Sequence, residues 1–418
     1  MTPDVEELLR RTLGHAAGRS PGLPDGTAQA VEHRYRRRRQ RSQALLAAAA
    51  VVLVAGGVTT GLRAADRAAP ATGPHGSTPD PARTASAALS PEASPTTFAA
   101  RPEPIEKVWP QALHEVPAKT PEGKRIIPIL LLDDRTLLVS TWASMEKTDA
   151  LYTYDLETLA LRKITDVVTP KGTALFASGF DAEGGQVAWW TKLKDGTAQI
   201  WAAPLAGGEA KLIGSRVIDG GGLDKIEIAG HRVVFSARSG GVFTVPLAGG
   251  EPEPVDGAAD MHLLSWPWIG APGPYGQARG ARYERIRNVE TGETDRALVR
   301  DGEQVHACGV RLCIGTSGRT SHYYRLRDGS RQRELPGVTP MLVPALDRFH
   351  VALLHYGDDS VEAALFDLQT GTAASLGVGA ERTDDGFSFT MPAVGDDERL
   401  LAYELGGTLR VVDLTKIT

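Results

Sequence analysis

The chain has 418 residues, with 46 Lys or Arg against 51 Asp or Glu and a formal net charge of −5. A chain of this length is too long to fold around one ordinary hydrophobic core. Residues 1–63 hold ten Arg against five Asp or Glu, so the rest of the chain carries −10. An acidic remainder is poorly suited to nucleic acid or to anionic lipid, which argues against both as its partners.

Residues 1–43 are predicted to form a short cytoplasmic segment. Five apolar residues fall on one face of a short amphipathic helix. This face needs a partner, and the alternatives are the membrane surface, another protein or none. The residues are Val5, Leu8, Leu9, Leu13 and Ala16.

A run of arginines next to a long uncharged stretch predicts a membrane anchor. Residues 44–62 are all uncharged, and a helix over them would be about 28 Å long, close to the thickness of the hydrocarbon core. Cytoplasmic flanks carry the excess positive charge, so the N-terminus is expected inside and the rest exported. The membrane-flanking residues are Arg34, Arg36, Arg37, Arg38, Arg39 and Arg41.

A cleaved signal peptide is the alternative to this anchor. About forty residues precede the apolar stretch, however, and the first Ala-x-Ala lies well beyond it, at residues 69–71. The spacing therefore favours an uncleaved transmembrane helix.

Residues 63–104 are predicted to form a disordered linker. From residue 64 to 104, 29 of 41 residues are Ala, Pro, Ser or Thr, with very few large apolar side chains to bury. Such a tether would allow the exported domain to stand off the membrane.

Residues 105–418 alternate short β-rich runs with Gly, Asp and Pro turns, which predicts an all-β domain. Two sequence patterns recur in it. The first is an apolar residue at a strand end, at Leu156, Leu205, Leu247, Val289, Leu326, Leu368 and Leu414. The second is a turn followed by an apolar strand, at Leu138, Val187, Val233, Ile269, Leu312, Val351 and Leu400. Seven copies averaging about 43 residues predict a seven-bladed β-propeller with four strands in each blade.

With these repeats, the exported region resembles seven-bladed propellers of the Tol-associated (TolB-type) or WD-repeat-like kind. The recurring Gly-His and Trp-Asp dipeptides of true WD repeats are absent, since no Trp-Asp occurs and Gly-His occurs once in residues 105–418, at 230–231. The whole layout, a short cytoplasmic segment before one membrane helix and an exported domain, is similar to bacterial anti-sigma factors. That resemblance implies a signalling role, although the zinc-binding His-x-x-x-Cys-x-x-Cys is missing because Arg19, not a cysteine, stands four residues after His15.

The seventh blade is predicted to lack its outermost strand. Its strands are expected near Phe387, Leu400 and Arg410, and only four residues follow Leu414. An open edge is unfavourable, so residues 105–109 or 113–116 are expected to supply the missing strand and close the ring.

Cys308 and Cys313 are the two cysteines of the chain. They lie between predicted strands at 304–307 and 312–315, and a hairpin would bring them within disulfide reach. Free thiols are the alternative. No Cys or His cluster stands near them to complete a zinc site.

The remaining chemistry-bearing residues do not form a recognisable catalytic or metal-binding set. Residues 105–418 contain no G-x-S-x-G motif, and the chain contains no H-E-x-x-H or P-loop motif. The adjacent Trp189 and Trp190 are expected to face opposite sides of one sheet, as are His350 and His355. The other histidines considered, His231, His306 and His322, are expected in different blades from one another and from His350. Four aspartate pairs predict turns rather than calcium sites: Asp133 and Asp134, Asp358 and Asp359, Asp384 and Asp385, and Asp396 and Asp397.

One Pro- and Gly-rich loop, residues 271–281, interrupts the blade rhythm. It is expected to join the second and third strands of blade four and to share a rim with residues 219–224 and 377–386. Tyr275 and Arg279 are of residue types enriched in binding hot spots, which makes them candidate anchors for a partner. A solvated insertion is the alternative.

These observations favour a single-pass plasma-membrane protein whose extracytoplasmic propeller binds a protein, peptide or cell-envelope ligand without catalysis. No cofactor and no catalytic residue is assigned. The alternative is an extracytoplasmic hydrolase or lyase with a site at the central channel. Two or more carboxylates at the channel mouth, or a His and a carboxylate at bonding distance, would favour the enzyme. An apolar or plugged channel would favour binding.

Overall fold

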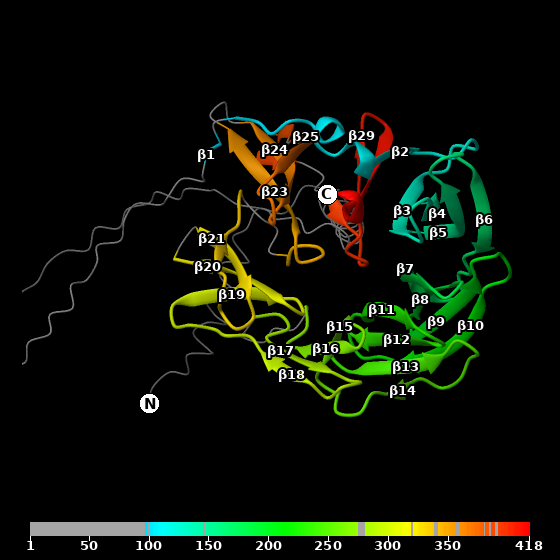
Figure 1. Ribbon diagram of the computed structural model, residues 1–418. Helices are drawn as coiled ribbons and strands as arrows, with labels where there is room; N and C mark the ends of the chain where they lie inside the picture. Colours follow the sequence, from blue (N-terminus) through cyan, green and yellow to red (C-terminus); the bar gives the residue numbers. More distant parts are fainter. Residues whose placement is uncertain are drawn as a thin grey trace, which may run out of the picture.

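The computed structural model describes residues 97–98, 100–144, 147–274, 281–318, 321–337, 342–356, 360–379, 381–383, 386–388 and 392–418. Within them, seven four-stranded sheets follow one another around a ring (Figure 1). This confirms the predicted seven-bladed, all-β propeller. The predicted membrane span, its flanking arginines and most of the linker lie outside the described residues. None of the helices that the structure describes has the length and apolar character of a membrane span.

The strands of blades one to five follow chain order. Blade one contains β3 (Ile126–Leu131), β4 (Thr136–Ser144), β5 (Lys147–Asp155) and β6 (Leu161–Asp166). Blade two contains β7 (Thr173–Glu183), β8 (Gln186–Leu193), β9 (Thr197–Pro204) and β10 (Lys211–Val217). Blade three contains β11 (Leu223–Ala229), β12 (Arg232–Ala237), β13 (Val242–Pro246) and β14 (Glu253–Pro254). Blade four contains β15 (His262–Ser265), β16 (Trp268–Ala271), β17 (Arg285–Asn288) and β18 (Thr294–Arg296). Blade five contains β19 (Glu303–Cys308), β20 (Leu312–Ser317), β21 (Ser321–Leu326) and β22 (Arg333–Glu334).

Blades six and seven each include a strand from the N-terminal side of the propeller. Blade six combines β1 (Thr97–Phe98) with β23 (Phe349–Tyr356), β24 (Val361–Asp367) and β25 (Ala373–Gly379). Blade seven combines β28 (Ala393–Val394), β29 (Leu400–Leu405) and β30 (Thr408–Asp413) with β2 (Leu113–Pro117). Short helical turns lie at α3 (Ile105–Val108), η1 (Pro110–Ala112) and η2 (Leu414–Lys416).

One backbone hydrogen bond recurs in all seven blades. The residue after the third blade strand donates its N–H to the carbonyl oxygen of the residue before the second strand, at 2.8 to 3.1 Å. It joins the two turns at one end of the blade. The two sequence patterns therefore recur at a similar distance from each other in every blade. The donor and acceptor pairs are Leu156 and Arg135, Leu205 and Gly185, Leu247 and His231, Val289 and Pro267, Arg327 and Arg311, Leu368 and Arg348, and Leu414 and Arg399.

In blades one, six and seven, side chains reinforce this bond. The arginine before the second strand bonds to the aspartate that ends the third strand, in the pairs Arg135 and Asp155, Arg348 and Asp367, and Arg399 and Asp413. Each of these aspartates also accepts a backbone N–H two residues further on, at 2.9 to 3.0 Å. The polar turns are therefore cross-linked within each of these blades.

The hydrophobic core lies between successive blades. Trp189 and Trp190 are both buried on β8, and they point into different cores. Trp189 packs with Leu138 and Leu151 of blade one, whereas Trp190 packs with Ile226 and other residues of blade three. This confirms their predicted orientation, because alternate residues of a strand face opposite sides of its sheet.

The predicted ring closure is confirmed. β2 pairs antiparallel with β30 from Leu113 opposite Val412 to Pro117 opposite Thr408, and it is the outermost strand of blade seven. Figure 1 shows the cyan segment that leads into it, passing across blade six. The predicted linker extended to residue 104, but β1 and residues 100–104 already lie on blade six.

The predicted placement of Phe387 in blade seven is wrong. Phe387 lies in β27 (Gly386–Ser388), which pairs with β26 (Glu381–Thr383) in a separate two-stranded sheet. Thr383 pairs with Gly386, so two residues separate the strands, the connection length that favours a self-contained hairpin. The innermost strand of blade seven is instead β28, which has two residues.

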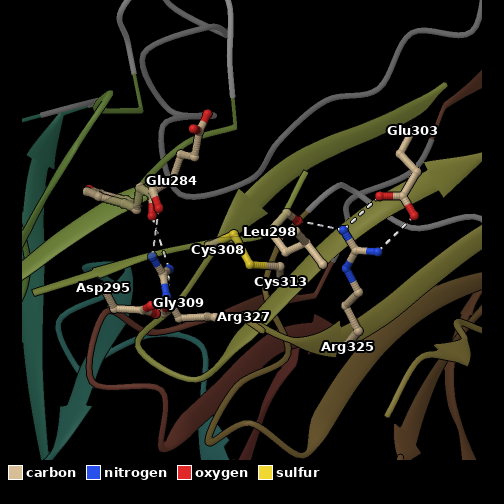
Figure 2. Close-up of a disulfide and its surroundings, with 10 residues drawn as sticks. Glu284, Asp295, Leu298, Glu303, Cys308, Gly309, Cys313, Arg325 and Arg327 are labelled. Atoms are coloured by element: carbon tan, nitrogen blue, oxygen red, sulfur yellow. Dashed lines mark hydrogen bonds and ion pairs between the residues drawn. A yellow bond between two sulfur atoms is a disulfide. The ribbon is translucent and has the colours of Figure 1, made fainter. Parts of the chain in front are cut away.

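The predicted disulfide is present in blade five. Cys308 and Cys313 are paired opposite each other on β19 and β20, with Cα atoms 4.0 Å apart. Figure 2 shows the bridge between two buried arginines, Arg325 and Arg327. Arg325 holds Glu303 with two hydrogen bonds of 2.8 Å, so its charge is compensated inside blade five.

Arg327 joins blade five to blade four. Its guanidinium donates to the carbonyl oxygens of Tyr283 and Glu284 at 3.1 and 2.7 Å, and it also bonds to Asp295. A second contact between these blades comes from the disulfide hairpin itself, where the N–H of Cys308 donates to the carbonyl oxygen of Arg282 at 2.9 Å. The disulfide hairpin therefore anchors the end of the loop that joins β16 and β17.

The Arg348 and Asp367 pair provides a test of the turn cross-links. Burial alone would raise the pKa of Asp367, but hydrogen bonds from Arg348, Thr370 and Gln369 outweigh it and lower the pKa to about 2. Asp367 is 1% exposed, so Arg348→Met leaves a buried carboxylate without its cation. We expect the free energy of unfolding at pH 7 to fall by about 3 kcal/mol.

Denaturant unfolding of the full chain in detergent measures this loss. The stabilisation is complete above the ordinary Asp pKa near 4 and is lost as the pH falls to about 2, so the difference between the proteins should narrow over that range. Arg135→Met is the matched control, because its side chain is 46% exposed and its loss should cost less than about 1 kcal/mol. Equal losses in the two variants would contradict the assignment.

Candidate functional site

The inner strand of blade three carries three polar side chains that reach the inner strand of blade four. In β11, Ile226 and Ile228 pack into the core shared with blade two, so Lys225 and Glu227 face the other way. The pairing of β11 with β12 shifts by one residue at Asp224, and this shift brings the Asp224 carboxylate to His262 of β15. The three side chains define a polar junction between β11 and β15.

Lys225 and Glu227 bond to backbone groups of blade four as well as to each other. The Lys225 Nζ donates to the carbonyl oxygen of Leu264 at 2.7 Å and lies 2.8 Å from Glu227 Oε1. Glu227 Oε2 accepts the N–H of Trp266 at 2.7 Å. These side chains therefore form hydrogen bonds with backbone groups at the inner edge of blade four, where no further strand is paired in the described sheet.

Asp224, Ser236 and His262 form the buried end of this junction. The Nδ1–H of His262 donates to Asp224 Oδ2 at 2.5 Å, and the Ser236 hydroxyl donates to Asp224 Oδ1. Ser236 Oγ also accepts the N–H of Leu263 at 2.9 Å. The serine thus donates to the aspartate and not to the histidine, unlike the nucleophile of a serine hydrolase.

The loop predicted as a binding rim begins against this histidine. A Cβ built on Gly273 would lie 2.3 Å from the His262 ring, so only glycine fits there without movement. The loop joins β16 and β17, the second and third strands of blade four, as predicted. Tyr275 and Arg279 themselves lie outside the described residues.

Asp181 extends the polar junction to blade two. Its Oδ2 accepts the N–H of Ile228 at 2.6 Å, so a carboxylate of β7 bonds to the inner strand of the next blade. Burial raises the pKa of Asp181 to about 6, and the nearby Glu227 adds to that rise. Asp181 is therefore a carboxyl group that titrates close to neutral pH.

Acidic residues of blade seven face the same region. Burial disfavours the charged form of Lys225, but Glu227, Asp396 and Glu398 outweigh it and raise its pKa above the ordinary value. Glu398 also accepts the N–H of Leu346 at 2.9 Å, which joins blade seven to blade six. Lys225 is therefore a permanent cation among carboxylates and cannot serve as a base or a nucleophile at neutral pH.

The junction meets one condition set for an enzyme, a His and a carboxylate at bonding distance. Asp224 and His262 are only 1% and 7% exposed, however, and Ser236 is not hydrogen-bonded to the histidine. No group of three or more His, Cys, Asp or Glu in the described residues is arranged to hold a metal ion. The arrangement is better suited to joining blades than to chemistry.

Other sequence predictions have mixed outcomes. Asp133 and Asp397 accept backbone N–H groups two and three residues further on, which confirms turns for the two described aspartate pairs.

His306 and His322 both lie in blade five, on β19 and β21, so their predicted separation into different blades is wrong. Blade five is compact, with four strands between residues 303 and 334, and both histidines fall within it.

Sequence reasoning missed the polar junction. The available signal was the alternation of Asp, Lys and Glu with Leu and Ile at 223–228, in a strand position that the repeat makes innermost. A charged face on a strand normally indicates solvent. Its contact with the next blade becomes visible only when the blades are placed side by side.

No protein-family profile matches the sequence, and no curated protein matches it. Among solved structures, the chain is similar to YCF48 bound to a D1 peptide, with 11% identity, a TM-score of 0.42 and coverage of 77% of this chain and 99% of that one. It is also similar to BamB from Moraxella catarrhalis, at 14% identity, TM-score 0.33 and coverage of 70% and 86%. An oligogalacturonate lyase from Vibrio parahaemolyticus has 12% identity, TM-score 0.31 and coverage of 72% and 91%. These values concern the fold alone and carry no argument about function.

Asp181→Asn tests the electrostatic cost of the junction. The amide oxygen can still accept the N–H of Ile228, while the buried charge is removed. We expect the free energy of unfolding at pH 7.5 to rise by up to about 3 kcal/mol, because the carboxylate is less stable in the folded than in the unfolded chain. This gain should shrink as the pH falls from about 6 to about 4, where the native carboxyl group takes up its proton.

Asp195→Asn is the control for the Asp181 variant. Asp195 is exposed in a turn, accepts the N–H of Thr197 at 2.9 Å, and has a pKa lowered by that bond. Its replacement should therefore give no gain at pH 7.5. A gain for Asp181→Asn that does not vary with pH would refute the assigned cause.

Proposed function

We propose that the protein is a single-pass plasma-membrane protein whose extracytoplasmic propeller is a non-enzymatic module that binds a protein, peptide or cell-envelope ligand. The observation that carries this proposal is the use of polar side chains on the inner strands and in the turn after one of them. Asp181, Glu227 and Glu398 each bond to a backbone N–H of a neighbouring blade. Such bonds stiffen the ring, and a rigid scaffold that presents loops suits binding.

An extracytoplasmic hydrolase or lyase is the second candidate. Its support is the hydrogen bond between His262 and Asp224, together with Asp181, whose raised pKa suits proton transfer near neutral pH. At this junction the candidate has no free serine nucleophile, because Ser236 is hydrogen-bonded to Asp224 and to the N–H of Leu263. Binding is therefore the better supported of the two functions.

The proposed topology is tested with tags at both ends of the full chain. In intact cells, a protease or antibody added outside should reach a tag after Thr418 but not a tag before Met1. Both tags should become accessible when the membrane is permeabilised. Exposure of the N-terminal tag in intact cells, or protection of the C-terminal one, would exclude this topology.

The binding function is tested by capture from a cell-envelope extract on the purified full chain in detergent. A captured component should rebind to fresh protein saturably and with unchanged mass. Tyr275→Ala combined with Arg279→Ala should weaken rebinding at least tenfold, as loss of hot-spot residues does. Leu212→Ala, at an exposed position of β10, is the matched control and should leave rebinding unchanged.

The same experiment separates the two candidates. Recovery of a chemically altered component, with the alteration abolished in His262→Gln, would replace binding by catalysis. Unaltered mass over prolonged incubation supports the binding module.

A further inference from the structure

Two histidines of blade five lie on the face that contacts blade six. The Nε2 of His306, on β19, is 3.2 Å from the hydroxyl oxygen of Thr316 on β20. Thr316 is paired directly opposite His322 of β21, and the side chains of such a pair share one face of the sheet. Tyr324, two residues further along β21, donates its hydroxyl to the carbonyl oxygen of Leu368 in blade six at 3.4 Å. Since alternate residues of a strand face the same side, His322 also faces blade six.

A third histidine reaches the same interface from blade six. Phe349 and Val351 of β23 pack into the core shared with blade seven, so His350 between them points toward blade five. His350 is only 3% exposed, and its Nε2 has no hydrogen-bond partner among the described residues. A charge in such a place would be buried without compensation, which is unfavourable. The interface therefore holds this imidazole in its neutral form.

The electrostatic surroundings of the three histidines oppose their protonation. Burial lowers the pKa of His306 and His322, and it lowers the pKa of His350 to about 3. His322 adds to the lowering of the pKa at both of the others. Arg282, whose backbone N–H donates to the carbonyl oxygen of His306 at 3.0 Å, adds to it at His306. Each of these neighbours carries positive charge when it is protonated.

The other charged groups around this interface give the histidines no compensation. Arg101, stacked on Tyr356 of β23, and Arg333, opposite Tyr324 on the neighbouring strand, are both positive. Protonation of the histidines therefore adds positive charge where carboxylates on or beside the described strands already have partners. Those pairings are Glu303 with Arg325, Asp347 with Arg311, Glu362 with Ser375, and Asp367 with Arg348.

We propose that the interface between blades five and six is an acid-sensitive joint, closed while His306, His322 and His350 are neutral and opened locally when they are protonated. The joint makes the rigidity of the ring depend on the acidity of the surroundings. This inference goes beyond the proposed binding function and does not depend on it.

The direction of the response follows from proton linkage. An exposed imidazole has a pKa near 6.5, so below that pH the opened interface takes up protons that the closed interface does not. His350 stays neutral in the closed interface down to about pH 3. This one residue should therefore favour opening about tenfold more for each pH unit, or about a hundredfold at pH 4.5.

Hydrogen exchange of the full chain in detergent measures this opening. Each exchange rate is compared with the intrinsic rate at the same pH, from about pH 7 to about pH 4.5. Protection in residues 304–308, 322–326 and 350–355 should fall by about a hundredfold or more over this range. Residues 186–204 of blade two contain no histidine and are the internal reference, whose protection should change less than about threefold.

His350→Phe identifies the cause of the response. Phenylalanine keeps a flat ring in the buried position but cannot be protonated, so the acid-induced loss of protection should shrink at least about tenfold. If this variant fails to fold, His322→Gln removes a half-buried member of the cluster and should also reduce the loss. His231→Gln is the matched control, because His231 is exposed in blade three and its replacement should leave the full response.

Two results would overturn the inference. One is a loss of protection at low pH that is as large in blade two as in blades five and six, because this would report general acid unfolding. The other is an equal loss in the unaltered chain and in the folded histidine variant. The measurement uses no ligand, so its outcome is separate from that of the capture experiment.

Discussion

The structure depends on one repeated backbone hydrogen bond, from the residue after the third strand of each blade to the residue before the second. It fixes the two turns at one end of the blade against each other and therefore fixes where the first strand must end. In β11 this placement brings Lys225 level with the carbonyl oxygen of Leu264 in β15, and Glu227 level with the N–H of Trp266 just after it. Every blade repeats this turn at the same end of its own sheet. The turn therefore also determines which groups of neighbouring blades come into contact.

The parts of the fold that could be predicted from sequence are those that this repeat encodes locally. Second-strand residues such as Leu138 and Leu400 and turn residues such as Leu156 and Leu414 all fall where the period places them. Ring closure by residues 113–116 followed from counting strands in the last blade. The placement of Phe387 failed for a related reason. A period counts residues and cannot distinguish a first blade strand from a hairpin inserted in the connection before it.

The polar junction could not be predicted because its geometry comes from two features that no single strand reveals. One is the shift of pairing at Asp224, which turns a side chain out of the alternation expected of a strand. The other is the identity of the facing surface, which is the backbone of another blade and not water. The same surroundings explain the raised pKa of Asp181. Its burial is a property of the assembled ring, whereas the depressed pKa of Asp367 comes mainly from nearby hydrogen-bond donors, led by Arg348.

Blades six and seven resolve the edge problem differently from the other five, and the difference organises the N-terminal side of the propeller. Blade seven takes its outermost strand from the segment between β1 and β2, and β2 pairs over five residues, which removes an open edge. Blade six takes a two-residue inner strand, β1, from the same segment, and Ile105 further along it is fully buried. A single segment thus contributes to two blades, through five residue pairs in blade seven and two in blade six. The chain before residue 97 joins the propeller at β1, on the inner side of blade six, so any displacement of that part of the chain acts on β1 before it reaches the bonds that close the ring.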